Sequence, residues 1–142
     1  MKKTATAQWS GDLKQGNGII STESGAIKAV PYSFHTRFEN EPGTNPEELI
    51  GAAHAGCFSM AFSGALGKAG FTPVKIETKA EVTLEKSDSG FSVTSSHLIM
   101  KAKVPNIDKN QFDSIANDAK ANCPISKLLN AKITLDATLE SA

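Results

Sequence analysis

The feature that most constrains this chain is an almost uncharged stretch in its middle, "NPEELIGAAHAGCFSMAFSGALGK", residues 45–68. Asn45 is suited to cap a helix, and the proline and two glutamates that follow it are favoured in a first helical turn. After the glutamates the next charge is Lys68, and Gly70 is a stop signal. Because apolar residues occur on nearly every side, we expect a long, buried helix.

Small residues recur along this helix at spacings of three and four and form one stripe. Glycine inside a helix costs roughly 1 kcal/mol relative to alanine, so such a stripe favours close approach by another helix. We interpret the stripe as a contact between two copies of the chain. Burial under the chain's own sheet and a chance arrangement of small residues stay open as alternatives. The stripe consists of Ala52, Gly56, Ser59, Ser63 and Gly67.

Strand patterns flank the helix on both sides. Residues 2–9 alternate, and residues 18–39 indicate short strands, which together predict a small meander. Residues 74–86 and 91–104 alternate around the turn "SDSG" and predict a long antiparallel hairpin. A second helix beginning at Asp108, a short helix opened by Pro124 and a strand at 132–140 complete the prediction: one α+β domain over residues 1–142, with antiparallel sheets around central helices.

Composition excludes several classes of function. Lys plus Arg number 15 and Asp plus Glu number 15, so no basic excess favours nucleic acid as a partner. The N-terminus lacks the apolar segment of a signal peptide, and no apolar run is expected to reach the roughly 18 residues of a membrane span. We therefore expect a cytoplasmic protein. No compact metal-ligand pair, phosphate loop or dinucleotide fingerprint is present, so neither metal nor cofactor is predicted.

The chain has two cysteines, Cys57 and Cys123. In a reducing compartment a structural disulfide is disfavoured, which leaves redox, catalytic or merely buried thiols. Cys57 lies in mid-helix, where burial would raise the thiol pKa. Cys123 directly precedes Pro124, at the start of a short helix whose free N–H groups would stabilise a thiolate. Local electrostatics therefore favours Cys123 as the low-pKa thiol, unless a cation reaches Cys57.

Arg37 is the only arginine in the chain, and its planar, permanently charged fork indicates either a geometric task or a surface position on a strand. His54 lies three residues before Cys57, so a Cys–His hydrolase pair is conceivable. Glu47 lies ten residues before Cys57, which is about 15 Å of helix. If both serve one site, the helix bends or Glu47 comes from a partner subunit.

The segments "PYSFHTRFE", "GTNPEELIGAAHAGCFSMAFSGALGKAGFTP" and "AKANCPISKLLNAKITLDATLE" together resemble the OsmC branch of the OsmC/Ohr family of thiol peroxidases. The resemblance implies an intertwined α+β homodimer with two sites at the subunit interface. Matched position by position, it implies that Cys57 is the peroxidatic cysteine and Cys123 the resolving one. It also implies that Arg37 stabilises the thiolate and that Glu47 holds this arginine.

The activity implied by the resemblance is reduction of organic hydroperoxides to alcohols. Cys57 would form a sulfenic acid and then a disulfide with Cys123, which a small dithiol or a lipoyl-type protein would reduce. Phe38, Phe58 and Phe62 are candidates to line an apolar substrate pocket. Two alternatives are a non-enzymatic redox-responsive interaction protein and the hydrolase that uses Cys57 and His54. Glu47 is predicted to reach the site from the other subunit.

Overall fold

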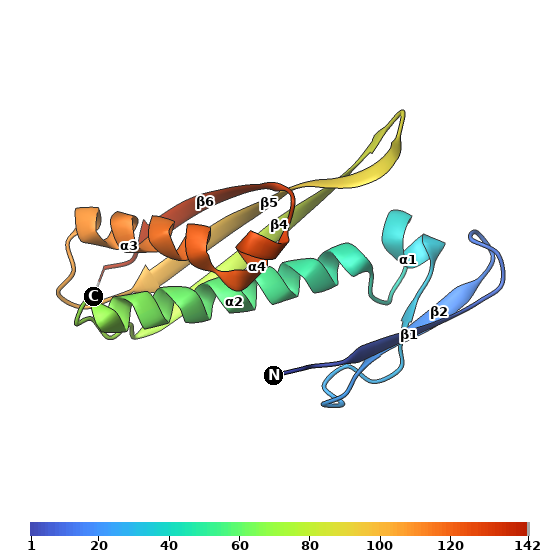
Figure 1. The fold of residues 1–142 in the computed structure, drawn as a ribbon, viewed down its shortest axis with the longest axis horizontal. Coiled ribbons are helices and arrows are strands. Elements are labelled where there is room, and N and C mark those ends of the chain that lie inside the picture. Colours follow the sequence, from blue (N-terminus) through green and yellow to red (C-terminus); the bar gives the residue numbers. More distant parts are fainter. Residues whose placement is uncertain (142) are drawn as a thin grey trace. The chain divides into compact units, whose positions relative to one another are not determined.

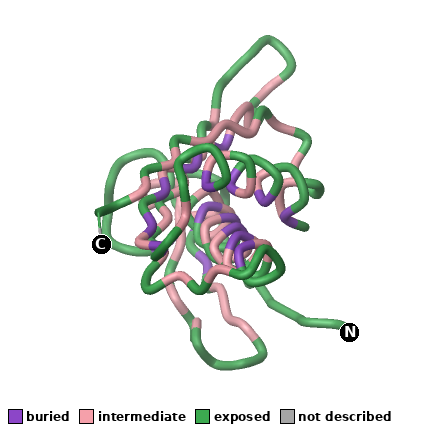
Figure 2. The backbone as a smooth tube through the Cα atoms, turned by 90° about the vertical axis from the view of Figure 1, so that its left-hand side faces the viewer, coloured by how far each residue is buried: buried purple, intermediate pink, exposed green. Residues whose placement is uncertain are grey.

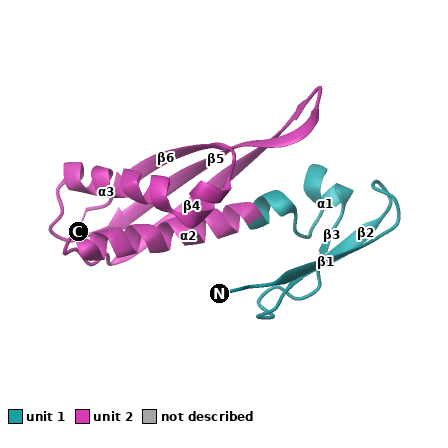
Figure 3. Cartoon of the chain, in the orientation of Figure 1, with its two compact units in different colours: residues 1–49 teal, residues 50–142 magenta. Residues whose placement is uncertain are grey.

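A computed structural model of the chain describes residues 1–141, which form two compact units divided between Leu49 and Ile50 (Figure 3). The described part is α+β, with a three-stranded sheet in each unit and four helices (Figure 1). This confirms the predicted fold class. The unit boundary falls within the first turns of helix α2, Pro46–Lys68.

The sheet of the first unit is an antiparallel meander in the order β1-β2-β3. β1 pairs with β2 along its full length, and the shorter β3 pairs with the other edge of β2. The strands are β1 (Ala5–Ser10), β2 (Asn17–Thr22) and β3 (Val30–Tyr32).

The segment that carries Arg37 is a short helix, α1 (Phe34–Phe38), and the prediction of a strand there is wrong. A capping box explains the difference. The Thr36 N–H donates to Ser33 Oγ at 3.1 Å, and the Ser33 N–H donates to Thr36 Oγ1 at 2.8 Å. These two bonds satisfy free N–H groups at the helix start, so the chain leaves β3 and turns at once into α1.

The termini of α2 agree with the prediction. The Glu48 N–H donates to Asn45 Oδ1 at 2.9 Å, which is the expected cap. After Lys68 the chain reaches Gly70 at φ +89°, a left-handed conformation that glycine adopts without a Cβ penalty.

The second unit contains the predicted hairpin, β4 (Lys75–Ser87) and β5 (Gly90–Lys103), in antiparallel pairing. The last strand, β6 (Lys132–Leu139), pairs with β5 in parallel, so this sheet is mixed rather than wholly antiparallel. The reason is the connection. Helices α3 (Lys109–Asn122) and α4 (Pro124–Leu128) return the chain along the sheet before β6 begins, and such a crossover is what parallel neighbours require.

The core of the second unit lies between its sheet and the helices α2 and α3 (Figure 2). The Phe58 and Phe62 rings of α2 stack with centroids 5.9 Å apart, and Phe112 of α3 meets Phe62 edge-on at 5.4 Å. All three side chains are completely buried, and Leu98 and Met100 of β5 complete the cluster. The core therefore fixes α2 and α3 on one sheet.

Helix α2 is only partly covered by its own chain. Gly51, His54, Phe58, Phe62 and Leu66 form the buried face, whereas the opposite face is exposed and includes Met60, whose side chain is 79% exposed. By length and composition alone α2 is apolar enough to span a membrane, so the expectation that no apolar run reaches that length is wrong. Core helices of soluble proteins pass the same test, and the buried face of α2 packs into the core of its unit.

Candidate active site

The two cysteines of the second unit lie against each other. Cys57 is half-buried on α2, and Cys123 is buried at the position that precedes α4. The Cys123 side chain lies close enough to raise the pKa of the Cys57 thiol, and both cysteines are free. The structure thus brings together two thiols that are far apart in sequence.

The environment of Cys57 opposes its ionisation. Burial raises the pKa of the Cys57 thiol above its ordinary value, and the hydrogen bond with Cys123 raises it further. The backbone N–H of Ile125, at the start of α4, donates to the Cys57 sulfur and acts in the opposite direction, but burial prevails. Within its own unit Cys57 is therefore a thiol, and a cation from elsewhere is needed to make a reactive thiolate at neutral pH.

The free N–H group at the start of α4 serves a different cysteine from the one predicted. Pro124 occupies the first helical position and Cys123 has non-helical angles of φ −55° and ψ 127°, as expected before a proline. The Cys123 side chain, however, makes no capping hydrogen bond. The Ile125 N–H acts on Cys57 instead, while Cys123 is buried in the core.

His54 does not form the Cys–His pair considered from sequence. Its Nδ1 lies 2.6 Å from Ser96 Oγ of β5, and its Nε2 lies 2.8 Å from Ser126 Oγ of α4. Burial lowers the pKa of His54, so the imidazole is neutral near pH 7. Sequence reasoning missed both serines, because they lie 42 and 72 residues from His54 and no local pattern marks them.

Arg37 and Glu47 meet in the first unit of the same chain. The Arg37 Nε donates to Glu47 Oε2 at 3.0 Å and its Nη2 donates to Glu47 Oε1 at 2.5 Å, which is the two-pronged geometry that a guanidinium favours. The Glu47 side chain is 13% exposed and that of Arg37 is 36% exposed. The guanidinium also lies 5.4 Å from the centre of the Phe38 ring. Helix α1 presents the arginine, and the first turn of α2 presents the carboxylate.

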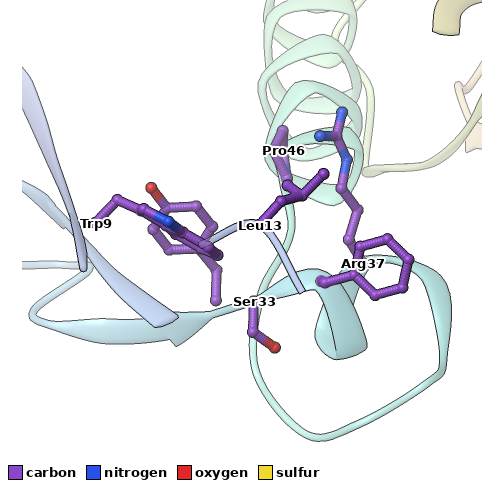
Figure 4. A pocket seen from close by; sticks show the side chains of 7 residues that line it. Trp9, Leu13, Ser33, Arg37 and Pro46 are labelled. Atoms are coloured by element: carbon purple, nitrogen blue, oxygen red, sulfur yellow. The ribbon is translucent and has the colours of Figure 1, made fainter. Parts of the chain in front are cut away.

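An apolar pocket of about 280 Å³ opens beside this arginine (Figure 4). The rings of Trp9 and Tyr32 form one wall, with centroids 5.3 Å apart, and the aliphatic walls come from Leu13 and Pro46. Arg37 supplies the only charge among the lining residues. Phe58 and Phe62, which the sequence offered as pocket residues, are fully buried in the core of the other unit. The lining is Trp9, Leu13, Tyr32, Ser33, Phe34, Arg37 and Pro46.

Across residues 1–141 no group of three His, Cys, Asp or Glu side chains converges as a metal site would require. The chemistry available in the described chain is therefore that of a thiol pair in one unit and of an arginine–glutamate pair beside an apolar pocket in the other.

Comparison with known proteins identifies the family. Residues 38–138 match the family model described as OsmC-like protein. The chain belongs to the OsmC-like protein family. It is 57% identical over 139 residues to the peroxiredoxin OsmC of Escherichia coli K12, covering 98% of this chain and 97% of that protein.

Two further relatives extend the OsmC-like assignment. The organic hydroperoxide resistance protein-like 1 of Staphylococcus saprophyticus is 32% identical over 121 residues, which is 84% of each chain. A solved OsmC-like protein of unknown function from Vibrio cholerae superposes with a TM-score of 0.76 at 18% identity, covering 96% of this chain and 99% of that one. The solved structure supports the fold. The names of the Escherichia coli and Staphylococcus saprophyticus relatives support a peroxiredoxin-type function.

Proposed function

We propose that this protein is a cysteine-based peroxidase that reduces organic hydroperoxides to alcohols. The observation that carries the proposal is the contact between the free thiols of Cys57 and Cys123. A peroxidase that recycles through a disulfide needs two thiols close enough to bond to each other. The Ile125 N–H, which lowers the pKa of Cys57, is a further feature that suits a reactive thiol.

The proposed reaction begins with the Cys57 thiolate, which attacks the outer oxygen of a hydroperoxide ROOH. The O–O bond breaks, RO⁻ leaves and takes a proton as ROH, and Cys57 becomes a sulfenic acid. The Cys123 thiol then condenses with the sulfenic acid, forming the Cys57–Cys123 disulfide and releasing water. A small dithiol or a lipoyl-type protein reduces this disulfide by exchange and becomes oxidised itself.

The Arg37–Glu47 pair is the proposed source of the missing positive charge. Arginine keeps its charge when partly buried, and the two bonds to Glu47 fix the orientation of the guanidinium. A guanidinium beside the sulfur would lower the pKa of Cys57 and polarise the peroxide. The support for this role is the geometry of the pair and its place at the edge of an apolar pocket.

The apolar lining of the pocket supports the proposed preference for organic hydroperoxides over hydrogen peroxide. An alkyl chain of a hydroperoxide would bury apolar surface against the Trp9 and Tyr32 rings, at roughly 0.8 kcal/mol for each buried CH₂ group. Hydrogen peroxide has no such group. The name of the Staphylococcus saprophyticus relative also refers to organic hydroperoxides.

We further propose that the protein works as a homodimer, formed through the exposed face of α2. Gly56, Gly64 and Gly67 have nothing within 4 Å of where a Cβ would lie, so their side of the helix is free for a close neighbour. This modifies the predicted small stripe, because Ser59 hydrogen-bonds Thr78 of β4 at 2.7 Å. A cytoplasmic location stays a prediction.

The Arg37–Glu47 pair of one subunit is proposed to serve Cys57 of the other. Glu47 and Cys57 lie on one helix, ten residues or about 15 Å of axial rise apart. A mixed dimer tests this, with Cys57→Ser in one copy and Glu47→Ala in the other. If the pair acts on Cys57 of the other subunit, the intact Cys57 of one copy meets the intact Glu47 of the other. The mixed dimer then has one complete site and about half of wild-type activity. Activity as low as that of the Glu47→Ala dimer would show that each subunit uses its own pair.

The activity is tested by following peroxide consumption with an alkyl hydroperoxide, with hydrogen peroxide, and with a dihydrolipoyl reductant. The Cys57→Ser variant should lose consumption, and Cys123→Ser should hold a trappable sulfenic acid without dithiol-driven turnover. Full turnover in Cys57→Ser would refute the mechanism. Consumption of only one equivalent of peroxide by the wild-type protein, in excess dithiol, would instead indicate a redox switch.

A further inference from the structure

His54 is a fully buried imidazole for which the proposed reaction has no use. Its two ring nitrogens join three elements of the second unit: Nδ1 meets Ser96 of β5, α2 carries the ring itself, and Nε2 meets Ser126 of α4. A buried polar group is retained at a cost unless its hydrogen bonds are made, and both of these are made. The hydrogen-bond network therefore connects α4 to α2 and β5.

Helix α4 depends on contacts with the rest of its unit to keep its position. It has five residues, none of them fully buried, which is too short to be stable by itself. Its N-terminal end nevertheless carries two groups that touch Cys57: the Cys123 side chain and the Ile125 N–H. Ser126 follows Ile125 directly, so the bond to His54 is made one residue from these contacts.

We propose that His54 is a positioning residue, which holds α4 through Ser126 so that Cys123 stays against Cys57 and the disulfide closes rapidly. The proposal rests on the proposed function for its physiological meaning. The step concerned is the condensation of the Cys57 sulfenic acid with the Cys123 thiol: an S–S bond forms, the S–OH bond breaks, and the thiol proton leaves with the hydroxyl as water.

The chemistry of the ring suits this task. A neutral imidazole is a donor at one nitrogen and an acceptor at the other, and serine hydroxyls pair with either. The partners in contact are the uncharged Ser96 and Ser126, and burial keeps the ring neutral. The bridge from β5 to α4 is thus complete without introducing a charge beside the thiol of Cys57, three residues further along α2.

Side-chain length offers a matched pair of variants. In His54→Gln the amide reaches about as far as Nε2, so the bond to Ser126 is retained. In His54→Asn the amide reaches only to the position of Nδ1, so the bond to Ser96 is retained and that to Ser126 is lost. Ser126→Ala removes the same bond from the other side, on a half-buried residue where loss of folding is less of a concern. Ser59→Ala is the control, because it removes a hydroxyl bond from α2 to β4 and leaves α4 alone.

The experiment is a single turnover of the full-length protein without reductant. An alkyl hydroperoxide first forms the Cys57 sulfenic acid, and mass spectrometry with a sulfenic-acid trap then follows its conversion to the disulfide. Closure in Ser126→Ala and His54→Asn should be slower by about tenfold, the equivalent of one hydrogen bond of ~1.4 kcal/mol. His54→Gln and Ser59→Ala should close within about twofold of wild type.

A second readout excludes a general structural effect. When α4 shifts, Cys57 loses both the Cys123 side chain, which raises its pKa, and the Ile125 N–H, which lowers it. Because Cys123 is the larger of these two causes, the pH midpoint for alkylation of Cys57 should fall in Ser126→Ala and stay unchanged in Ser59→Ala. Unchanged closure in Ser126→Ala, or equal slowing in Ser59→Ala, would overturn the proposal.

A peroxide-independent arm separates this proposal from the peroxidase itself. Oxidised glutathione forms a mixed disulfide with Cys57 and releases one glutathione. Cys123 then displaces the second glutathione and closes the same disulfide. If the wild-type protein closes with glutathione and does not react with hydroperoxide, the proposed function fails. Slower closure with glutathione in Ser126→Ala would support the positioning role even then, and equal closure would refute it.

Discussion

Replacing Glu47 by glutamine tests whether the carboxylate orients Arg37. Both carboxylate oxygens accept from the guanidinium, at 3.0 and 2.5 Å, and the Glu47 side chain is 13% exposed. In Glu47→Gln one oxygen remains as an acceptor, but the other becomes an NH₂ group that faces an Arg37 N–H, donor against donor. The side chain also loses its charge.

The magnitude follows from the lost bond. A hydrogen bond to a charged group contributes about 1.5–3 kcal/mol. Because Arg37 is 36% exposed, water replaces part of this contribution, and the lower end of the range applies. About 1.5 kcal/mol corresponds to a rate roughly tenfold lower. We therefore expect Glu47→Gln to reduce kcat/KM for an alkyl hydroperoxide about tenfold, and Glu47→Asp, which keeps the charge, to lose less.

The neighbouring glutamate provides the control. Glu48→Gln removes the same charge from the same helical turn, but Glu48 is exposed and lies outside the Arg37 pair. The assay is the rate of Cys57 oxidation by an alkyl hydroperoxide in stopped flow, with thermal unfolding measured in parallel. Equal rates in Glu47→Gln and Glu48→Gln would refute the reasoning. A loss in Glu47→Gln that tracks a lower melting temperature would refute it as well.

Four further outcomes are expected from the same geometry. Phe62→Ala should lower the free energy of unfolding by about 3–5 kcal/mol in guanidinium titrations, because the ring is fully buried between Phe58 and Phe112. The wild-type protein should lose stability as pH falls below about 6.5, because His54 binds a proton readily in the unfolded chain but resists protonation when buried. The free energy of unfolding should change by at most about 1.4 kcal/mol per pH unit from this cause, and less in His54→Gln, when unfolding is followed from about pH 8 to 5. Trp9→Ala should raise KM several-fold for a bulky alkyl hydroperoxide and leave the rate with hydrogen peroxide nearly unchanged, as steady-state assays would show. Arg37→Ala should move the pH midpoint for alkylation of Cys57 upward, and an unmoved midpoint would remove Arg37 from the thiolate's surroundings.

Much of the local structure could be predicted from short patterns. Asn45 caps α2 and Asp108 caps α3, with the Gln111 N–H donating to Asp108 Oδ1 at 2.8 Å. The prediction failed where two patterns competed. Residues 34–38 are predicted as part of a strand, but the capping box between Ser33 and Thr36 spans only four residues and favours a helix.

The candidate site was predictable by residue type and by resemblance, but less so by position. A lone arginine and two cysteines are visible in the sequence, and burial of Cys57 could be inferred from its place in an apolar helix. That the Ile125 N–H acts on Cys57, while Cys123 makes no capping hydrogen bond, could not be inferred from local pattern. Phe58 and Phe62 likewise could be assigned to core or pocket only after their neighbours were known.

The sequence by itself determined the caps, the turns, the hairpin and the inventory of reactive groups, because these depend on residues within one or two turns of each other. Only the tertiary structure decided which groups meet: Cys57 with Cys123, and His54 with serines 42 and 72 residues away. It also decided that β6 joins β5 in parallel. Such pairings are set by the packing of α2, α3 and the sheet around one core, and no local pattern encodes the closure of loops that long.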